Sequence, residues 1–450
     1  MKTNLLLSLF LLATFTLPAQ DKNFDLSRYK TPEYKRHELT STFSLSGSRS
    51  TFEQQEASGN LWLDAVDFEK SQFHTAAELQ YQFNFNSRKK VTFISATLTP
   101  NYQSKKDKEG PNTTKSTDAQ LHLQFSGNQD YYLQEDKFFL TVAPSIFYST
   151  HKDKLTSNSN TNKTTNNNYV LQLGLGGGYG RIEPISDYWQ AYYILQSLEK
   201  DGLLNRELTD DDIFEFAQTA TKLKNKRFFD YRIRKIAELE ALDSLLHKQE
   251  LVTESTISYF TTMNDYWSFA SVPDRYAGRK LTATVSPHYS HNMQKNNDTD
   301  QWENDLTLLI AQLNYRCVRP INLYWDRIFN LNLSEKIRLS DEDLGYPSNI
   351  LNLSSSIGWN YTPNFRTIAR FGVGYYGIEE PKYSATEEEQ KYWKNTLALN
   401  GSISYYLSPQ LQINGQLQAY YSDKPMRTSY LTQDNSIRLS LNLGFSYAIF

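Results

Sequence analysis

The sequence is short of several features that would assign it to common protein classes. It has one cysteine, Cys317, so the fold cannot rest on an intramolecular disulfide. The formal net charge is only −3, which gives no reason to expect nucleic acid as a partner. After residue 20 no apolar run reaches 18 residues, and the mean hydropathy is −0.61. The sequence therefore excludes a membrane-spanning helix in the mature chain.

Catalytic and metal-site signatures are also missing. A nucleophile needs a base within reach, and the serines and histidines of this chain show no spacing that indicates such a pair. His288 and His291 fall on opposite faces of one predicted strand and are too sparse for a metal site. We therefore expect no enzymatic activity, no cofactor and no metal.

The N-terminus indicates export. Lys2 precedes an apolar run from Leu5 to Leu17, and Ala19 follows before polar sequence begins. This pattern predicts a signal peptide over residues 1–20, and the lack of a cysteine after the run argues against a lipid anchor. Residues 21–37 are charged and contain Pro32, so we expect them to form a periplasmic N-terminal segment.

Aromatic residues are abundant for so polar a chain, at 14%, with 31 Tyr and 25 Phe. A transmembrane β-barrel explains this combination, because only alternate residues of its strands face lipid and aromatic girdles mark both interfaces. The clearest strand is the last one, in which every second residue from Ile437 to Ile449 is apolar. The chain then reaches Phe450, which resembles the recognition signal read by the barrel assembly machinery, although Phe450 has the opposite parity from the apolar series.

Similar period-two runs recur along the chain and predict an all-β membrane protein, an antiparallel barrel of about 14 strands. Six strands fall within residues 38–180 and eight within residues 276–450, so both termini return to the periplasm. A soluble β-sandwich interrupted by helices explains these features less well. The runs cover residues 39–45, 77–85, 91–102, 119–125, 138–148, 169–179, 281–289, 306–315, 329–339, 351–361, 365–376, 397–407, 411–421 and 437–450.

Connection lengths support the same topology, since such barrels alternate long external loops with short periplasmic turns. We expect long loops at the odd-numbered connections and tight turns at the even-numbered ones, such as residues 87–90, 362–364 and 408–409. The long loops are expected at residues 49–70, 104–116, 150–166, 292–301, 340–347, 379–391 and 422–433.

Residues 181–275 carry the only helical periodicity of any length, and the alternation places them in the periplasm after the sixth strand. Ser186 is a candidate cap for a first helix that ends at Gly202. Thr209 and the acids that follow it predict a capping box for a second helix. A third helix carries the stripe from Phe229 to Leu246, and a fourth starts near Thr253. Four such helices can enclose a small core of their own.

A basic cluster lies at the junction between the second and third of these helices. One interpretation is contact with anionic phospholipid heads or peptidoglycan carboxylates, or with a periplasmic protein. The other is a solvated helix face balanced by neighbouring acids, which is the commoner role of charge runs. The cluster consists of Lys222, Lys224, Lys226, Arg227, Arg232, Arg234 and Lys235.

Three stretches together carry a family resemblance: DLSRYKTPEYKR at residues 25–36, GGYGRIEPISD at 177–187 and LKNKRFFDYRIRKIAELEALDSLL at 223–246. With them the chain resembles an uncharacterised family of outer-membrane β-barrel proteins of Bacteroidota that carry a helical insertion. The resemblance implies an outer-membrane location and this architecture. It transfers no functional residues.

The positions that alternate with the apolar ones predict a lumen rich in neutral amides and poor in charge. Such a lining suits water and uncharged polar solutes without strong ion selectivity. A filled, non-conducting interior is the alternative, but 14 strands exceed the roughly eight that side chains alone can fill. We therefore predict a passive channel for small polar solutes, or else a periplasmic docking or assembly scaffold anchored by a closed barrel. The lumen candidates are Glu78, Gln80, Gln82, Gln124, Gln172, Arg370, Asn400, Gln416 and Arg438.

Overall fold

The computed structural model describes residues 28–54, 57–58, 61–62, 66–109, 111–158, 160–225, 231–268, 274–297, 300–340, 349–382, 390–408, 411–423 and 436–447. The expected signal peptide, residues 21–27 and Phe450 lie outside the described residues.

The body of the molecule is one 14-stranded antiparallel sheet in which each long strand pairs with the next along the chain. Six of these strands precede the helices and eight follow them, so the predicted strand number and the position of the insertion are confirmed. A two-stranded hairpin, β2 (Ala57–Ser58) and β3 (Leu61–Trp62), forms a separate small sheet. The long strands are β1 (Tyr34–Gln54), β4 (Val66–Asn86), β5 (Lys90–Glu109), β6 (Asn112–Tyr132), β7 (Phe138–Ser157), β8 (Asn160–Pro184), β9 (Tyr276–Asn296), β10 (Asp300–Pro320), β11 (Trp325–Arg338), β12 (Asn349–Asn364), β13 (Thr367–Lys382), β14 (Gln390–Tyr406), β15 (Leu411–Ser422) and β16 (Ser436–Tyr447).

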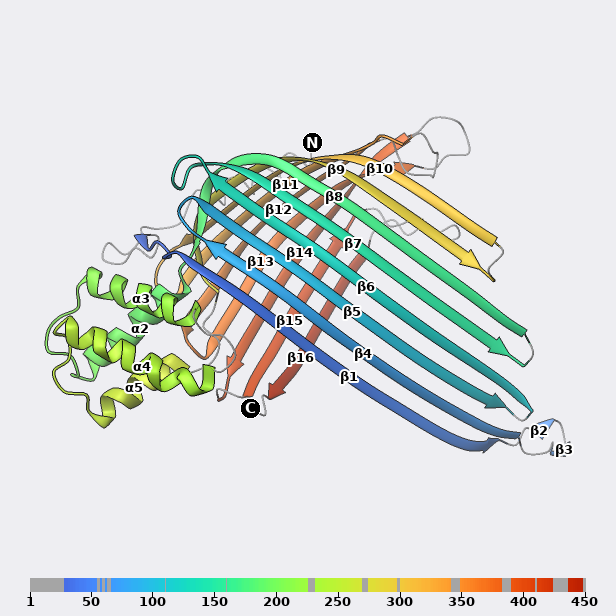
Figure 1. The fold of residues 1–450 in the computed structure, drawn as a ribbon, viewed down its shortest axis with the longest axis horizontal. Coiled ribbons are helices and arrows are strands. Elements are labelled where there is room, and N and C mark those ends of the chain that lie inside the picture. The colour runs from blue at the N-terminus through green and yellow to red at the C-terminus, as the bar shows by residue number, and fades with distance from the viewer. Residues whose placement is uncertain are drawn as a thin grey trace.

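Figure 1 shows that this sheet is strongly curved, with the helices gathered at one end and β2 and β3 at the opposite end. β1 and β16 are its two edges, and no ladder joins them within the described residues. The sheet is therefore open along this line in the structure, and closure into a barrel stays a prediction.

The two ends of the sheet differ in their connections. At the end that carries the helices, which we call the short-turn end, β4 and β5 are joined through residues 87–89 and β12 and β13 through residues 365–366. Asn364 Oδ1 accepts hydrogen bonds from the backbone N–H groups of Arg366 and Thr367, both at 2.9 Å, and so closes the second of these turns. The tight turn expected at residues 87–90 is present, and the one expected at 362–364 lies at residues 365–366, because β12 continues to Asn364. The turn expected at 408–409 lies partly outside the described residues.

At the opposite end, the hairpin end, the expected long loops are wrong for three connections. Residues 104–116, 150–166 and 292–301 instead extend the strands of three hairpins, β5–β6, β7–β8 and β9–β10. Their ladders continue to the pairs Glu109–Asn112, Ser157–Asn160 and Asn296–Asp300. Asn158 and Asn297 occupy the tips of the second and third hairpins with φ of 50°. The first connection, residues 49–70, is likewise mostly strand among its described residues and carries β2 and β3. Most of the last three expected loops lies outside the described residues.

The extensions have a simple physical origin. Lys, Thr, Ser and Asn occupy both faces of these segments, as in KDKLTSNSNTNKTTNNN at residues 152–168. Both faces can therefore be solvated while the ladder hydrogen bonds continue, and the apolar–polar alternation that reveals a half-buried strand is lost.

The helical module consists of α2 (Ser186–Lys200), α3 (Asp210–Asn225), α4 (Tyr231–Lys248) and α5 (Ile257–Ser268). The predicted capping box is confirmed, because the Asp212 N–H donates to Thr209 Oγ1 at 3.3 Å and the Thr209 N–H donates to Asp212 Oδ2 at 2.9 Å. Gly202, with φ of 68°, ends α2 as expected. Ser186 does not cap α2; its hydroxyl accepts a 2.9 Å hydrogen bond from the Arg275 N–H instead.

Candidate functional site

The sheet has one apolar and one polar face, and β7 and β8 show this most clearly. Directly opposite residues of paired strands share a face, and successive residues of one strand alternate between faces. Leu171, Leu173 and Leu175 of β8 are 49%, 42% and 50% exposed, and Leu140 of β7 is 55% exposed. We call this side, which carries contiguous exposed leucines, the apolar face.

Aromatic pairs bound the apolar face at both ends. The rings of Phe138 and Tyr179 lie 5.2 Å apart at the short-turn end, and those of Tyr148 and Tyr169 lie 4.8 Å apart toward the hairpin end. The two aromatic residues of each strand are ten positions apart, which is about 33 Å along the strand. At the tilt usual in membrane barrels this corresponds to an apolar band about 25 Å tall.

All nine lumen candidates lie on the other side of the sheet, the polar face. Glu78, Gln80 and Gln82 of β4 pair with Thr42, Thr40 and Glu38 of β1, and Gln80 also pairs with Thr97 of β5. The ladder continues from Thr97 through Gln124 to β7 and from Ser145 to Gln172. We call β1 to β8, which precede the helices, the near half of the sheet, and β9 to β16, which follow them, the far half. On the far half, Arg370 pairs with Ser402 and Arg438 pairs with Tyr420. Asn400 and Gln416 lie between them on β14 and β15. Six of the nine are exposed, and Gln80, Gln82 and Gln172 are half-buried.

The polar face is the concave one around β8. Lys280 of β9 and Asp130 of β6 form an ion pair although β7 and β8 lie between their strands. The two side chains can meet because β8 presents Gly176 and Gly178 to this face, opposite Thr284 and Thr282. The Lys280 ammonium also lies 4.8 Å from the centre of the Phe139 ring.

Sequence reasoning missed several charges on the polar face. Asp130, Lys280 and Arg316 lie just outside the runs assigned to strands, because β6 continues to Tyr132, β9 starts at Tyr276 and β10 continues to Pro320. Lys336 lay inside an assigned run. Its parity is that of Asn332 and Ser334, so strict alternation could have revealed it.

Arg181 ties together the turns at the short-turn end and is only 6% exposed. It donates to Asn86 Oδ1 at 2.6 Å and to the Ser87 carbonyl at 2.9 Å, and it forms an ion pair with Glu183 at 2.9 Å. Arg88 reaches the same Glu183 carboxylate at 2.6 Å. This network lies beside a charged hollow of about 470 Å3.

The helical module shares its core with the turns of the sheet. Trp189 of α2 packs against Phe365 of the β12–β13 turn, with ring centres 4.7 Å apart, and donates through Nε1 to the Leu323 carbonyl at 3.1 Å. Tyr193 donates to the Pro363 carbonyl at 2.6 Å. The module is therefore fixed to two turns of the far half of the sheet, in agreement with its place beside this end in Figure 1.

The N-terminal segment enters the same core from the near half. Tyr29 is 1% exposed and stacks on Tyr188 and Phe214 at 5.4 and 6.4 Å. Its hydroxyl lies 3.0 Å from Thr221 Oγ1, and burial raises the pKa of this phenol. The chain then runs directly into β1.

The basic cluster is only partly described. Lys222 is exposed on α3. Lys224 instead packs against α2, where its ammonium lies 2.5 Å from both Asp187 Oδ1 and Gln190 Oε1, and it also lies 5.5 Å from the Trp267 ring centre. Lys226 and Arg227 lie outside the described residues, as do the side chains of Arg232, Arg234 and Lys235 on α4.

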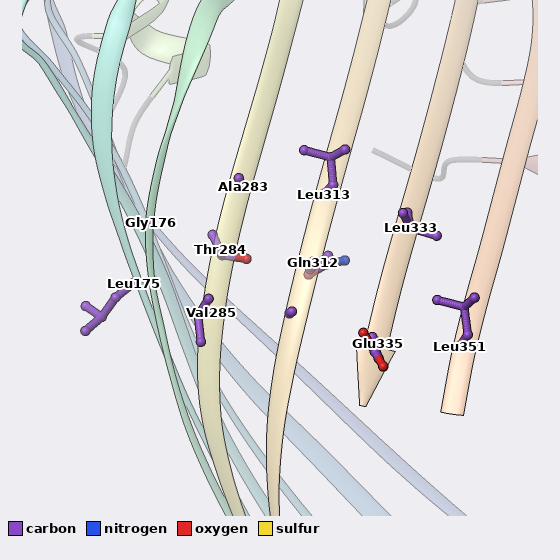
Figure 2. Close-up of a pocket in the computed structure, with 11 residues that line it drawn as sticks. Leu175, Gly176, Ala283, Thr284, Val285, Gln312, Leu313, Leu333, Glu335 and Leu351 are labelled. Atoms are coloured by element: carbon purple, nitrogen blue, oxygen red, sulfur yellow. The ribbon is translucent and has the colours of Figure 1, made fainter. Parts of the chain in front are cut away.

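A hollow of about 370 Å3 interrupts the apolar face between β8 and β12. Ala283 and Ala311 have short side chains there. Figure 2 shows Leu313 on β10, the strand of Ala311, and Leu333 and Leu351 on the next two strands. The Glu335 carboxylate lies beside Leu351, its cross-strand partner. Thr284 and Gln312 also line the hollow, and its other lining residues are apolar, which suits an alkyl chain.

Two searches of the described residues bear on other kinds of site. None of the described helices is long and apolar enough to cross a membrane. No described group of three or more His, Cys, Asp or Glu side chains could hold a metal ion.

Comparison with known proteins finds no matching family model and no matching curated protein. Among solved structures, the translocator domain of autotransporter NalP from Neisseria meningitidis is 10% identical, with 83% of this chain and 88% of that chain covered and a TM-score of 0.28. The P. putida toluene transporter TodX is 10% identical over 93% and 90% of the two chains, with a TM-score of 0.29. The CymD monoaromatic hydrocarbon channel is 9% identical over 93% and 89%, also with a TM-score of 0.29.

Proposed function

We propose that this chain is an outer-membrane β-barrel that works as a passive channel for small polar solutes. The observation that carries the proposal is the contrast between the two faces of one sheet. An exposed apolar band of bilayer height, bounded by aromatic pairs, backs a concave face on which exposed amides and charges accumulate. A closed sheet of 14 strands encloses more space than its own side chains fill.

The proposed orientation follows from the two ends. Short turns are typical of the periplasmic side of such barrels and long hairpins of the outer side. The helical module and the start of β1 would then be periplasmic, and the polar hairpin extensions would stand above the outer leaflet. The edge position of β16 agrees with recognition of the C-terminal strand by the barrel assembly machinery.

Two adjacent residues of β8 test the membrane placement. Leu173→Cys and Gln172→Cys, each made in a Cys317→Ser background and labelled with bimane, should respond oppositely in liposomes. We expect brominated acyl chains to quench the label at position 173 and aqueous iodide to quench it at 172. Quenching of both labels by iodide alone would contradict a lipid-facing band.

Conductance tests the channel itself. The purified full-length protein, inserted in a planar bilayer in KCl, should give discrete and stable steps of current. A bilayer that stays sealed at high protein load, while bimane quenching shows insertion, would overturn the channel and leave the membrane placement intact.

A docking scaffold is a second candidate because the module exposes two isoleucines. Ile236 of α4 is 69% exposed and Ile257 at the start of α5 is 85% exposed. Their replacement by Asp should release a periplasmic partner without changing conductance. Because the module shares its core with the barrel turns, these point variants are a cleaner test than deletion of the module.

A further inference from the structure

We propose that the polar face favours small anions, so that the channel conducts them in preference to cations. The inference rests on the proposed channel and names its solute class. Four cationic side chains share the polar face on four different strands: Arg316 of β10, Lys336 of β11, Arg370 of β13 and Arg438 of β16. Arg316, Arg370 and Arg438 are exposed, and Lys336 is half-buried.

The register fixes this placement for each of the four. Arg316 pairs with Lys280 on one side and Asn330 on the other. Lys336 pairs with Ile310, and Ile310 pairs with Ser286 on its other side. The Ser286 hydroxyl lies beside Gly174 on the concave face, so Lys336 shares that face. Arg370 lies between Asn360 and Ser402, and Arg438 lies opposite Tyr420.

The acids of the polar face do not balance these cations. Within the described residues behind the apolar band, Asp130 is neutralised by Lys280, Asp326 by Arg275 and Glu38 by Arg36. Glu78 on β4 is the remaining carboxylate there whose side chain is described, and Glu380 of β13 has the same parity as Arg370. These two acids do not offset the four cations of β10 to β16. The polar face of the far half, which we call the far wall, therefore carries a net positive charge.

Such an excess matters more inside a barrel than on an open surface. Low-dielectric walls focus the field of fixed charges into the aqueous space and raise the local concentration of counter-ions. Rings of Arg and Lys are the usual lining of anion and phosphate pores. Three of the four cations are arginines, whose planar forks match carboxylate and phosphate oxygens. Small oxyanions are thus the solute class best suited to this wall.

The neutral-amide lining expected from sequence changes in one respect. The amides are present on the polar face, but the expectation of no strong ion selectivity counted only Glu78, Arg370 and Arg438 as its charges. Adding Arg316 and Lys336, and recognising that Asp130 and Lys280 neutralise each other, converts a nearly balanced wall into a positive one.

The reversal potential across a planar bilayer tests the proposal with the wild-type protein. Under a tenfold KCl gradient centred near 0.1 M, the sign should show a chloride-to-potassium permeability ratio above one. The ratio should approach one when the gradient is centred near 1 M, because the screening length falls from about 10 Å to about 3 Å. Sieving by size alone would leave the ratio unchanged by salt.

Charge variants then assign the effect. The variant Arg316→Gln, Lys336→Gln, Arg370→Gln, Arg438→Gln should lose the anion preference, and Glu78→Gln should increase it. Lys222→Gln removes an exposed charge from the helical module and should leave the ratio unchanged. The heat-modified shift of each variant on SDS gels checks that the barrel has folded.

The possible failures are distinguishable. Stable conductance with a permeability ratio at or below one in wild type overturns anion selectivity and leaves the channel standing. A sealed bilayer overturns the channel and this inference with it. The sign measured on wild type decides the question even where the fourfold variant does not fold.

Discussion

Arg275 and Asp326 form a bidentate ion pair whose side chains are 1% and 2% exposed. The Arg275 Nε–Asp326 Oδ2 distance is 2.9 Å and the Nη2–Oδ1 distance is 2.6 Å. Arg275 is the last residue before β9, and it also donates to the Asn322 carbonyl at 3.2 Å. The chain leaving the helical module is therefore bound to the β10–β11 turn by a buried charge pair.

We expect Asp326→Ala to loosen the module. Removal of one partner leaves the Arg275 guanidinium buried and unpaired, which typically costs about 3–5 kcal/mol. Limited trypsin digestion in detergent should then cleave within residues 222–235 much faster than in wild type. The matched control is Asp210→Ala, which breaks the Arg28–Asp210 pair, 59% and 56% exposed, and should cost less than about 1 kcal/mol. Equal digestion of the two variants would contradict the anchoring role.

Tyr29 provides a second anchor, from the N-terminal side. Tyr29→Ala removes a fully buried ring that stacks on Tyr188 and Phe214, with an expected loss of about 3–5 kcal/mol. Tyr29→Phe keeps the stack and removes only the contact with Thr221, so it should cost about 1 kcal/mol. Hydrogen exchange of peptides from α2 and α3 measures both effects. If the hydrogen-exchange protection of α2 and α3 is the same in Tyr29→Ala as in wild type, the N-terminal segment does not stabilise the helical module.

The sequence sufficed to predict those features that are set by local chemistry. On β7, β8 and β16 apolar and polar residues alternate strictly, because one face of each strand is apolar and the other polar. The number of strands and the face of each residue could therefore be predicted from the sequence. The Thr209–Asp212 capping box is equally local and is present as predicted. The hairpin extensions were missed because both of their faces are polar and carry no alternation.

Long-range contacts account for the other misses. Ser186 precedes a helical stripe, as a cap would, but its hydroxyl is engaged by Arg275, 89 residues away. Likewise, Phe365 has the apolar character of a strand residue, yet it packs into the helical module against Trp189 and Tyr193. The periodicity of the sequence does not reveal that the β12–β13 turn completes the core of the helical module.

Acid should weaken the start of α3 through Asp212. The hydrogen bonds from Arg206 at 2.7 and 2.8 Å, together with those from Thr209, lower the pKa of Asp212 from 3.8 to about 2. The carboxylate is favoured in the folded state, so its stabilisation is complete above pH 3.8 and disappears as the pH falls through 2. Hydrogen exchange of peptides covering residues 210–225 should show Asp212→Asn less protected than wild type at pH 5. The two should converge near pH 2, and a difference that persisted there would assign the effect to something other than this charge.

We expect the curvature of the sheet at β8 to depend on the absence of a side chain at Gly176. A Cβ built there would collide with the Ala283 carbonyl oxygen and come within 2.8 Å of Thr284 Cα, both of them backbone atoms of β9. Backbone within a ladder cannot move aside without breaking hydrogen bonds, so we expect Gly176→Ala to cost about 1–3 kcal/mol or more. Gly444 of β16 is the matched control, because a Cβ there meets nothing within 4 Å. The temperature at which each variant loses its folded band on SDS gels should drop for Gly176→Ala and stay at the wild-type value for Gly444→Ala. Equal midpoints would mean that the sheet flattens at β8 without penalty, and the concave face would then not depend on glycine at this strand.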